Sequence, residues 1–196
     1  MKRIVFLPFT LALFVLVSFT NNLQEPEVGN KASDFRLKNV DGKMISLSDY
    51  KGAPAYVVIF TCNSCPFAVE WEDRIIDLHA KYAPKGIPVL AINPNDPAIS
   101  KEDSFEKMVE VSKKHKYEFP YLFDQEQTAA RSYGATRTPH AFVLDKDLVI
   151  RYIGAIDNNH KDAKAADKKY VEDAIDAILQ NKEVKTKSTK AVGCTI

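Results

Sequence analysis

The chain has 196 residues, of which 45% are hydrophobic and 27% charged, and its formal net charge is +1. This length supports one domain with a substantial core and is short for two. The near-neutral charge argues against a nucleic-acid-binding protein, because phosphate binding requires a basic excess gathered on one face. Cys62, Cys65 and Cys194 are the three cysteines. An odd number with one closely spaced pair is atypical of a disulfide scaffold and indicates thiol chemistry.

The first 20 residues differ in composition from the rest. Lys2 and Arg3 precede an apolar run that reaches residue 19. This order is typical of a secretory signal peptide. The run is close to the lower length limit of a membrane span, so an uncleaved N-terminal anchor is the alternative. In both cases we expect the following domain in an oxidising compartment, either periplasmic or secreted.

The first elements after this segment follow from local patterns. Residues 21–33 are polar and contain proline and glycine, which predicts a linker. The Asp41–Gly42 pair lies between alternating segments and predicts a β-hairpin. Residues 55–60, AYVVIF, are continuously apolar and predict a strand buried on both faces. From residue 66 to 82 apolar side chains recur at helical spacing.

The second half continues the alternation of strands and helices. Strands are predicted within residues 87–93, 119–124 and 140–156, and helices within residues 104–117, 125–135 and 162–182. A βαβ unit followed by an antiparallel pair gives an α/β fold with one mixed central sheet and helices on both faces. We therefore expect one domain over residues 34–181 and a C-terminal tail over residues 182–196.

The Cys62-x-x-Cys65 motif stands where a predicted strand gives way to a predicted helix. The partial positive charge of a helix N-terminus stabilises a thiolate on the first cysteine. The second sulfur is near enough to close a small disulfide ring during exchange. Pro66 suits a first helical turn. Zinc would need two further ligands, and since none of the four histidines lies at metal-ligand spacing, we expect no metal.

A second element, Thr138–Pro139, directly precedes a predicted strand. A proline at such a place is often cis, and the residue before it then exposes its backbone to an extended substrate. With the Cys-x-x-Cys motif at the other end of this strand order, the sequence resembles the thioredoxin fold. The N-terminal hairpin resembles that of the redoxin branch, which contains the TlpA/ResA-type thiol–disulfide oxidoreductases and the AhpC/TSA (peroxiredoxin) group. The resemblance spans roughly residues 29–180.

This resemblance implies a thioredoxin-like fold with an N-terminal β-hairpin and a thiol–disulfide oxidoreductase activity. Cys62 matches the nucleophilic cysteine of thioredoxins, Cys65 the resolving one, and Thr138–Pro139 the substrate-facing pair with its cis proline. It implies that the redox-active Cys62–Cys65 disulfide is the only cofactor and that the partners are protein disulfides. If the protein acts as a reductant outside the cytoplasm, the resemblance also implies that a membrane thiol carrier recharges it.

Two alternatives stay open. In peroxiredoxins the peroxide-reactive cysteine resembles Cys65 with its following proline, but a threonine stands where this chain has Cys62 and an arginine where it has Pro139. These departures favour disulfide exchange over peroxidase activity. The other alternative is a thioredoxin-fold module that uses the Thr138–Pro139 edge only to bind proteins. Cys194 is a second-stage resolving thiol, the site of an intermolecular disulfide, or a tail residue without redox function.

Overall fold

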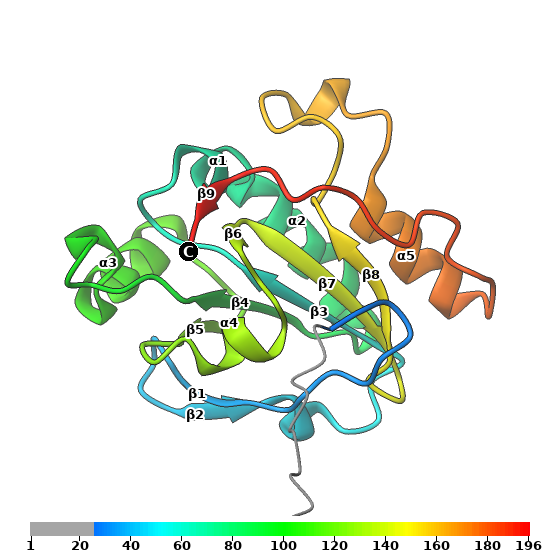
Figure 1. Cartoon of the computed structure of the whole chain (residues 1–196), viewed down its shortest axis with the longest axis horizontal. Helices are drawn as coiled ribbons and strands as arrows, with labels where there is room; N and C mark the ends of the chain where they lie inside the picture. The colour runs from blue at the N-terminus through cyan, green and yellow to red at the C-terminus, as the bar shows by residue number, and fades with distance from the viewer. Residues whose placement is uncertain (1–25) are drawn as a thin grey trace, which may run out of the picture.

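The computed structural model describes residues 26–196 (Figure 1). The segment predicted as a signal peptide or anchor, residues 1–20, lies outside the described residues. Within residues 26–196, every helix is too short or too polar to span a bilayer. Part of the predicted linker pairs with the sheet, because the Gly29 N–H donates to the Ile150 carbonyl (2.8 Å) and Lys31 bridges to Val149.

A seven-stranded mixed sheet forms the centre of the molecule, in the order β2-β1-β5-β4-β3-β7-β8. Strands β3, β4 and β5 run parallel, whereas β1–β2 and β7–β8 are antiparallel pairs at opposite ends. The predicted mixed sheet with an N-terminal hairpin is confirmed. The strands are β1 Arg36–Asn39, β2 Met44–Ser46, β3 Ala55–Phe60, β4 Val89–Asn93, β5 Tyr121–Phe123, β7 His140–Asp145 and β8 Ile150–Gly154.

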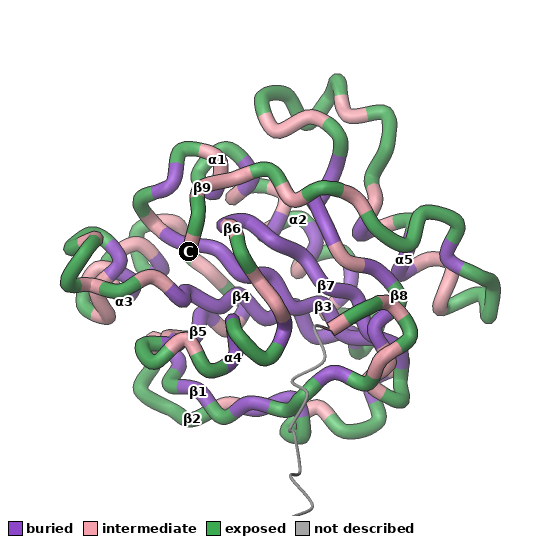
Figure 2. The backbone as a smooth tube through the Cα atoms, viewed as in Figure 1, coloured by how far each residue is buried: buried purple, intermediate pink, exposed green. Residues whose placement is uncertain are grey.

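Strand β3 lies at the middle of the sheet and all six of its residues are buried. Its side chains alternate between two cores, with Val57 and Ile59 in one and Val58 and Phe60 in the other. Burial on both faces explains why this strand reads as an unbroken apolar run. Figure 2 shows the central strands in purple nearly throughout, while the tail and the outer loops carry the exposed residues.

Helices cover both faces of the sheet. Helices α2, α3 and α5 pack on the face of Val57, and α4 packs on the face of Phe60. The helices are α1 Pro66–Glu70, α2 Glu72–Tyr82, α3 Phe105–His115, α4 Thr128–Ser132 and α5 Tyr170–Leu179, with 3₁₀ turns at Leu47–Tyr50, Ala83–Lys85, Lys101–Asp103 and Ala163–Ala165. Two layers of helices around one mixed sheet are the predicted α/β arrangement.

The last helix is shorter than the sequence pattern predicts. It begins at Tyr170 and not near residue 162, and residues 161–165 are exposed. The stretch of alanines and charged residues before Tyr170 has no large apolar side chain to bury. Since helical stability in proteins comes mostly from packing of an apolar face, this stretch does not continue the helix.

The C-terminal tail returns to the opposite end of the domain. After α5 it passes along β8, where Ile153 bridges to Ser188. It then forms β9 (Cys194–Thr195), which pairs antiparallel with β6 (Arg137–Thr138). In Figure 1 this red segment ends beside β6 and α1. The tail therefore lies against the region of the cysteine motif.

Candidate active site

The two cysteines of the motif occupy the turn between β3 and α1. Helix α1 begins at Pro66, with Cys65 as its N-cap residue. The Cys65 carbonyl accepts the first helical hydrogen bond from the Val69 N–H (3.0 Å). Proline suits this position because its missing N–H would have no partner in the first turn. The helix thus starts after the second cysteine, and Cys65, not Cys62, borders its N-terminus.

The bend between the cysteines is held by Asp103, a buried residue that the sequence analysis did not single out. Its carboxylate accepts from the Asn63 N–H and the Ser64 hydroxyl, both at 2.6 Å, and from Asn95 Nδ2 at 2.9 Å. Burial acts to raise the pKa of Asp103, but these hydrogen bonds outweigh it and hold the pKa below its usual value. The anion fixes the geometry of the motif from a 3₁₀ turn that lies 40 residues away from Asn63 in sequence.

Thr138 contacts both cysteines of the motif. The Cys62 Sγ lies 3.1 Å from the Thr138 hydroxyl, and the Cys65 Sγ lies 3.2 Å from its carbonyl oxygen. The Thr138–Pro139 peptide bond is cis. The structure therefore brings together the four residues that the sequence predicted for the site.

Cys194 completes the group of sulfurs. It is bonded to Cys65, with the two Cα atoms 5.9 Å apart, and its own N–H donates to the Cys65 Sγ (3.3 Å). Cys62 is a free thiol and only 6% exposed. The disulfide in this structure is thus Cys65–Cys194, whereas the resemblance implied a Cys62–Cys65 pair. Cys194 therefore lies beside both motif cysteines, and a role as a second-stage resolving thiol stays a prediction.

The environment of Cys62 favours its protonated form. Burial raises the pKa of the Cys62 thiol, and the negative charge of Asp103 adds to the rise, while the hydrogen bond with Thr138 opposes it. A thiol with a raised pKa is a weak nucleophile at neutral pH. Cys62 is therefore mostly protonated at neutral pH in this structure.

His140 follows the cis proline and begins β7. Burial lowers its pKa to about 4, so its ring is neutral at physiological pH. Its Nδ1 is buried without a hydrogen-bond partner in the part of the chain that the structure describes. Across residues 26–196, no three His, Cys, Asp or Glu side chains are arranged to hold a metal ion.

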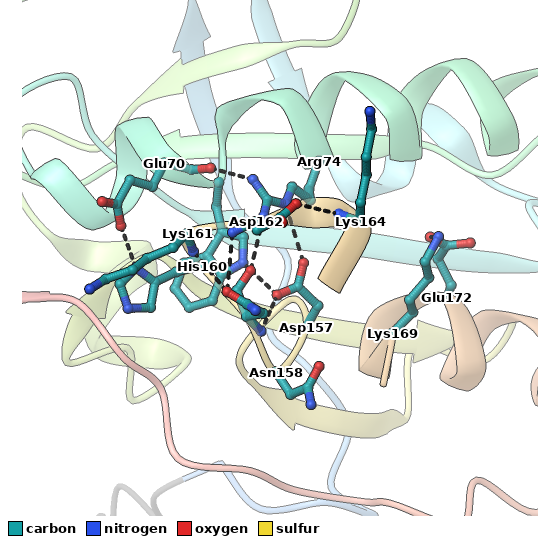
Figure 3. Close-up of polar contacts among 12 residues, drawn as sticks. Glu70, Arg74, Asp157, Asn158, His160, Lys161, Asp162, Lys164, Lys169 and Glu172 are labelled. Carbon is teal, nitrogen blue, oxygen red and sulfur yellow. Dashed lines mark hydrogen bonds and ion pairs between the residues drawn. The ribbon is translucent and has the colours of Figure 1, made fainter. Parts of the chain in front are cut away.

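A polar cluster supports the helix behind the motif (Figure 3). Asp157 accepts from Trp71 Nε1 (2.9 Å) and from Arg74 Nε (3.3 Å), and Arg74 Nη1 donates to the Glu70 carbonyl (2.6 Å). The Glu70 carboxylate pairs with His160, whose ring lies against Phe67. These contacts tie α1 to the loop after β8 and fix the helix that follows Cys65.

A protein-family model matches most of the domain. The AhpC/TSA family model matches residues 28–153. The chain belongs to the AhpC/TSA family. This family assignment confirms the redoxin resemblance seen in the sequence, and it makes the chain a relative of thiol oxidoreductases.

Two relatives have names that describe different activities, one a peroxiredoxin and the other a thiol–disulfide oxidoreductase. The chloroplastic peroxiredoxin Q from Oryza sativa subsp. japonica is 28% identical over 132 residues, which cover 64% of this chain and 57% of that protein. The chain thus spans little more than half the length of that relative. The thiol–disulfide oxidoreductase ResA from Bacillus thuringiensis subsp. konkukian is 25% identical over 126 residues, covering 63% of this chain and 67% of that protein.

Solved structures support the fold. An uncharacterized conserved protein from Geobacillus kaustophilus matches with a TM-score of 0.82 and 35% identity, covering 88% of this chain and 93% of that one. A thiol:disulfide interchange protein of the thioredoxin family from Chlorobium tepidum matches with a TM-score of 0.59 and 20% identity, covering 75% and 97%. The second likeness concerns the fold alone, which is thioredoxin-like.

Proposed function

We propose that this protein is an exported thiol–disulfide oxidoreductase that exchanges disulfides with partner proteins through Cys62 and Cys65. The observation that carries the proposal is the arrangement at Thr138. Cys65 is already joined to a cysteine of an extended segment that pairs with the strand before Pro139. This is the arrangement that a mixed disulfide with a partner would adopt on the same edge.

The exchange needs no further cofactor. In the reducing direction, one protein thiolate attacks a partner disulfide, forms a mixed disulfide and releases one partner thiol. The second protein thiolate then attacks the mixed disulfide, which leaves a Cys62–Cys65 disulfide and frees the other partner thiol. Two electrons and two protons pass to the partner. A dithiol donor must restore the pair, and we propose a membrane thiol carrier for this role, because the N-terminal segment favours export.

The geometry supports Cys65 as the cysteine that meets the partner and Cys62 as the one that releases it. Both cysteines are buried, but Cys65 borders the helix N-terminus and is bonded to the segment on the docking edge, whereas the pKa of the Cys62 thiol is raised. This order is the reverse of the one implied by thioredoxins, in which the first cysteine attacks. The physical reason for preferring the reversed order is that Cys65, and not Cys62, is the cysteine already bonded to the segment on this edge.

The test uses full-length chains with Cys194→Ser, so that the tail cannot resolve a mixed disulfide. Reduced protein is mixed with insulin, and the products are identified by mass. With the proposed order, Cys62→Ser accumulates a protein–insulin disulfide at Cys65, and Cys65→Ser accumulates none. Accumulation in Cys65→Ser alone would restore the thioredoxin order. Failure of the unsubstituted chain to reduce insulin would argue against oxidoreductase activity and leave the binding module.

A peroxidase is the second candidate, because the Cys65–Cys194 disulfide is also the product expected when a peroxide-oxidised Cys65 is resolved by Cys194. Against it, Pro139 stands where peroxiredoxins have arginine, and the Arg137 guanidinium donates to the Gly193 carbonyl (2.9 Å). Steady consumption of hydrogen peroxide by Cys62→Ser with dithiothreitol as reductant would favour the peroxidase.

A further inference from the structure

The edge of β6 is covered by the last residues of the chain. Thr138 lies opposite Cys194 and Arg137 opposite Thr195 in the antiparallel register. The Ile196 N–H donates to the Thr136 carbonyl (3.2 Å). This edge adjoins the Thr138–Pro139 bond and both motif cysteines, so the tail occupies the place where an extended partner would reach Cys65.

Gly193 approaches this edge more closely than any other residue type could. A Cβ built on it would lie 2.1 Å from the Thr138 carbonyl oxygen, 2.6 Å from the Thr138 carbonyl carbon and 3.0 Å from the Pro139 nitrogen. All three are main-chain atoms of Thr138 or Pro139, and Thr138 is fully buried. They cannot move aside as a flexible side chain would. The edge therefore accepts glycine, and no larger residue, immediately before the cysteine that bonds to Cys65.

The tail is attached to the domain independently a few residues earlier. The Thr189 N–H donates to the Ile153 carbonyl (3.0 Å), and its hydroxyl accepts from the Ala155 N–H (3.0 Å). Gly154 makes room for this threonine, since a Cβ there would lie 2.2 Å from the Thr189 hydroxyl oxygen. Residues 190–196 can therefore leave β6 while the preceding part of the tail keeps its place on β8.

We propose that the β6 edge is a docking surface for an extended segment of a partner protein that carries glycine directly before its reactive cysteine. Residues 190–196 are the internal substitute for that segment. This inference rests on the proposed function and adds to it the chemistry of the partner. The tail itself supplies the evidence, because its Gly-Cys pair is already seated and bonded on the edge.

Release of the tail needs no external electrons. The Cys62 thiolate attacks the Cys65 Sγ, the Cys65–Cys194 bond breaks and the Cys62–Cys65 bond forms. Cys194 leaves as a thiolate and takes up the proton that Cys62 gave up, so one disulfide replaces another. The edge is then open. A partner thiolate that docks there attacks Cys65, forms a partner–Cys65 disulfide and returns Cys62 to the thiol form. A second partner thiol completes the reaction, leaving an oxidised partner and two protein thiols.

Two synthetic peptides test the selectivity on one protein. The protein is the reduced full-length chain with both Cys62→Ser and Cys194→Ser, so that no second thiol can release the adduct. The peptides are acetyl-KAVGCTI and acetyl-KAVACTI, each activated at cysteine as a mixed disulfide with thionitrobenzoate. The rate of thionitrobenzoate release at 412 nm is measured, and the adduct is located by mass. We expect the glycine peptide to react at least about tenfold faster, because its alanine counterpart meets the Thr138 carbonyl, and we expect its adduct at Cys65. Both peptides act on the same variant, so its folding does not enter the comparison.

The outcomes are distinct. Equal rates for the two peptides, with normal reduction of insulin by the unsubstituted chain, would overturn the docking proposal and leave the oxidoreductase intact. Loss of reaction with both peptides and with insulin would remove the proposed function and this inference together. A Cys194-linked dimer as the main oxidised form of the unsubstituted chain would assign the edge to the tail of a second copy and would also overturn the proposal.

Discussion

Gly193→Ala is the substitution that measures the fit of the tail most directly. It is placed in a Cys62→Ser background, so that Cys65 and Cys194 are the only pair that can form an internal disulfide. The added methyl group would lie 2.1 Å from the Thr138 carbonyl oxygen, far inside van der Waals contact. Since the opposing atoms belong to the backbone, β9 must move away from β6.

The cost follows from the contacts that this movement breaks. They are the hydrogen bond from the Ile196 N–H to the Thr136 carbonyl (3.2 Å) and the one from Arg137 to the Gly193 carbonyl (2.9 Å). Each hydrogen bond contributes about 1 kcal/mol net, so the loss of both destabilises the docked tail by about 2 kcal/mol. This free energy corresponds to a roughly 30-fold smaller equilibrium constant for forming the Cys65–Cys194 disulfide against glutathione.

The assay equilibrates the protein in buffers of known reduced and oxidised glutathione, stops exchange with acid, and counts free thiols by alkylation and mass. Val192→Ala is the matched control, because Val192 is an exposed neighbour in the same tail, and we expect its equilibrium constant to stay within twofold of the parent. A value for Gly193→Ala within twofold of the parent would refute the argument that the edge admits only glycine.

Three further predictions concern groups around the motif. Asp103→Asn removes an acceptor from the network that holds the motif, so we expect it to lower the free energy of unfolding, measured by urea titration, by about 1–3 kcal/mol. The control is Glu102→Gln at an exposed position, which we expect to change this free energy by less than about 0.5 kcal/mol. Alkylation of Cys62 in the chain with Cys65–Cys194 intact should have a midpoint pH above that of a free cysteine peptide, and Asp103→Asn should lower it; a midpoint at the peptide value would contradict the effect of burial. The pKa of His140 is about 4 in the folded chain and about 6.5 in the unfolded one. As the pH drops, the unfolded state therefore binds the proton first. The free energy of unfolding then falls between about pH 6.5 and about pH 4, by up to about 1.4 kcal/mol per pH unit. His140→Gln should flatten this slope in unfolding titrations, and parallel curves for the two chains would show that the histidine does not titrate as described.

The parts of the fold that could be predicted are those that leave a local pattern in the sequence. Residues 55–60 read as a buried strand because both faces of β3 are covered. The Asp41–Gly42 turn marked the β1–β2 hairpin, because such a turn needs a residue with positive φ, and Gly42 has φ of 87°. The pairing of the Cys-x-x-Cys motif with Thr138 came from the family resemblance and not from any local pattern.

The features that escaped prediction depend on contacts between distant segments. Strand β9 has two residues, too few for a period of alternation, and its disulfide joins positions 129 residues apart. Asp103 stands in a polar loop and reads like any solvated acid until Asn63 and Ser64 are seen donating to it.

The anchor at Thr189 turns the end of the chain into a short tether. Five residues lead from Lys190 to Cys194, a reach of at most about 18 Å when fully extended. A thiol confined to so small a volume acts like a millimolar reagent. A partner cysteine at a lower concentration reaches Cys65 only if the partner binds the residues around Cys65 more tightly than the tail does. When the partner leaves, Cys194 returns to Cys65. The tether thus sets an affinity threshold for partners and shields Cys65 between reactions.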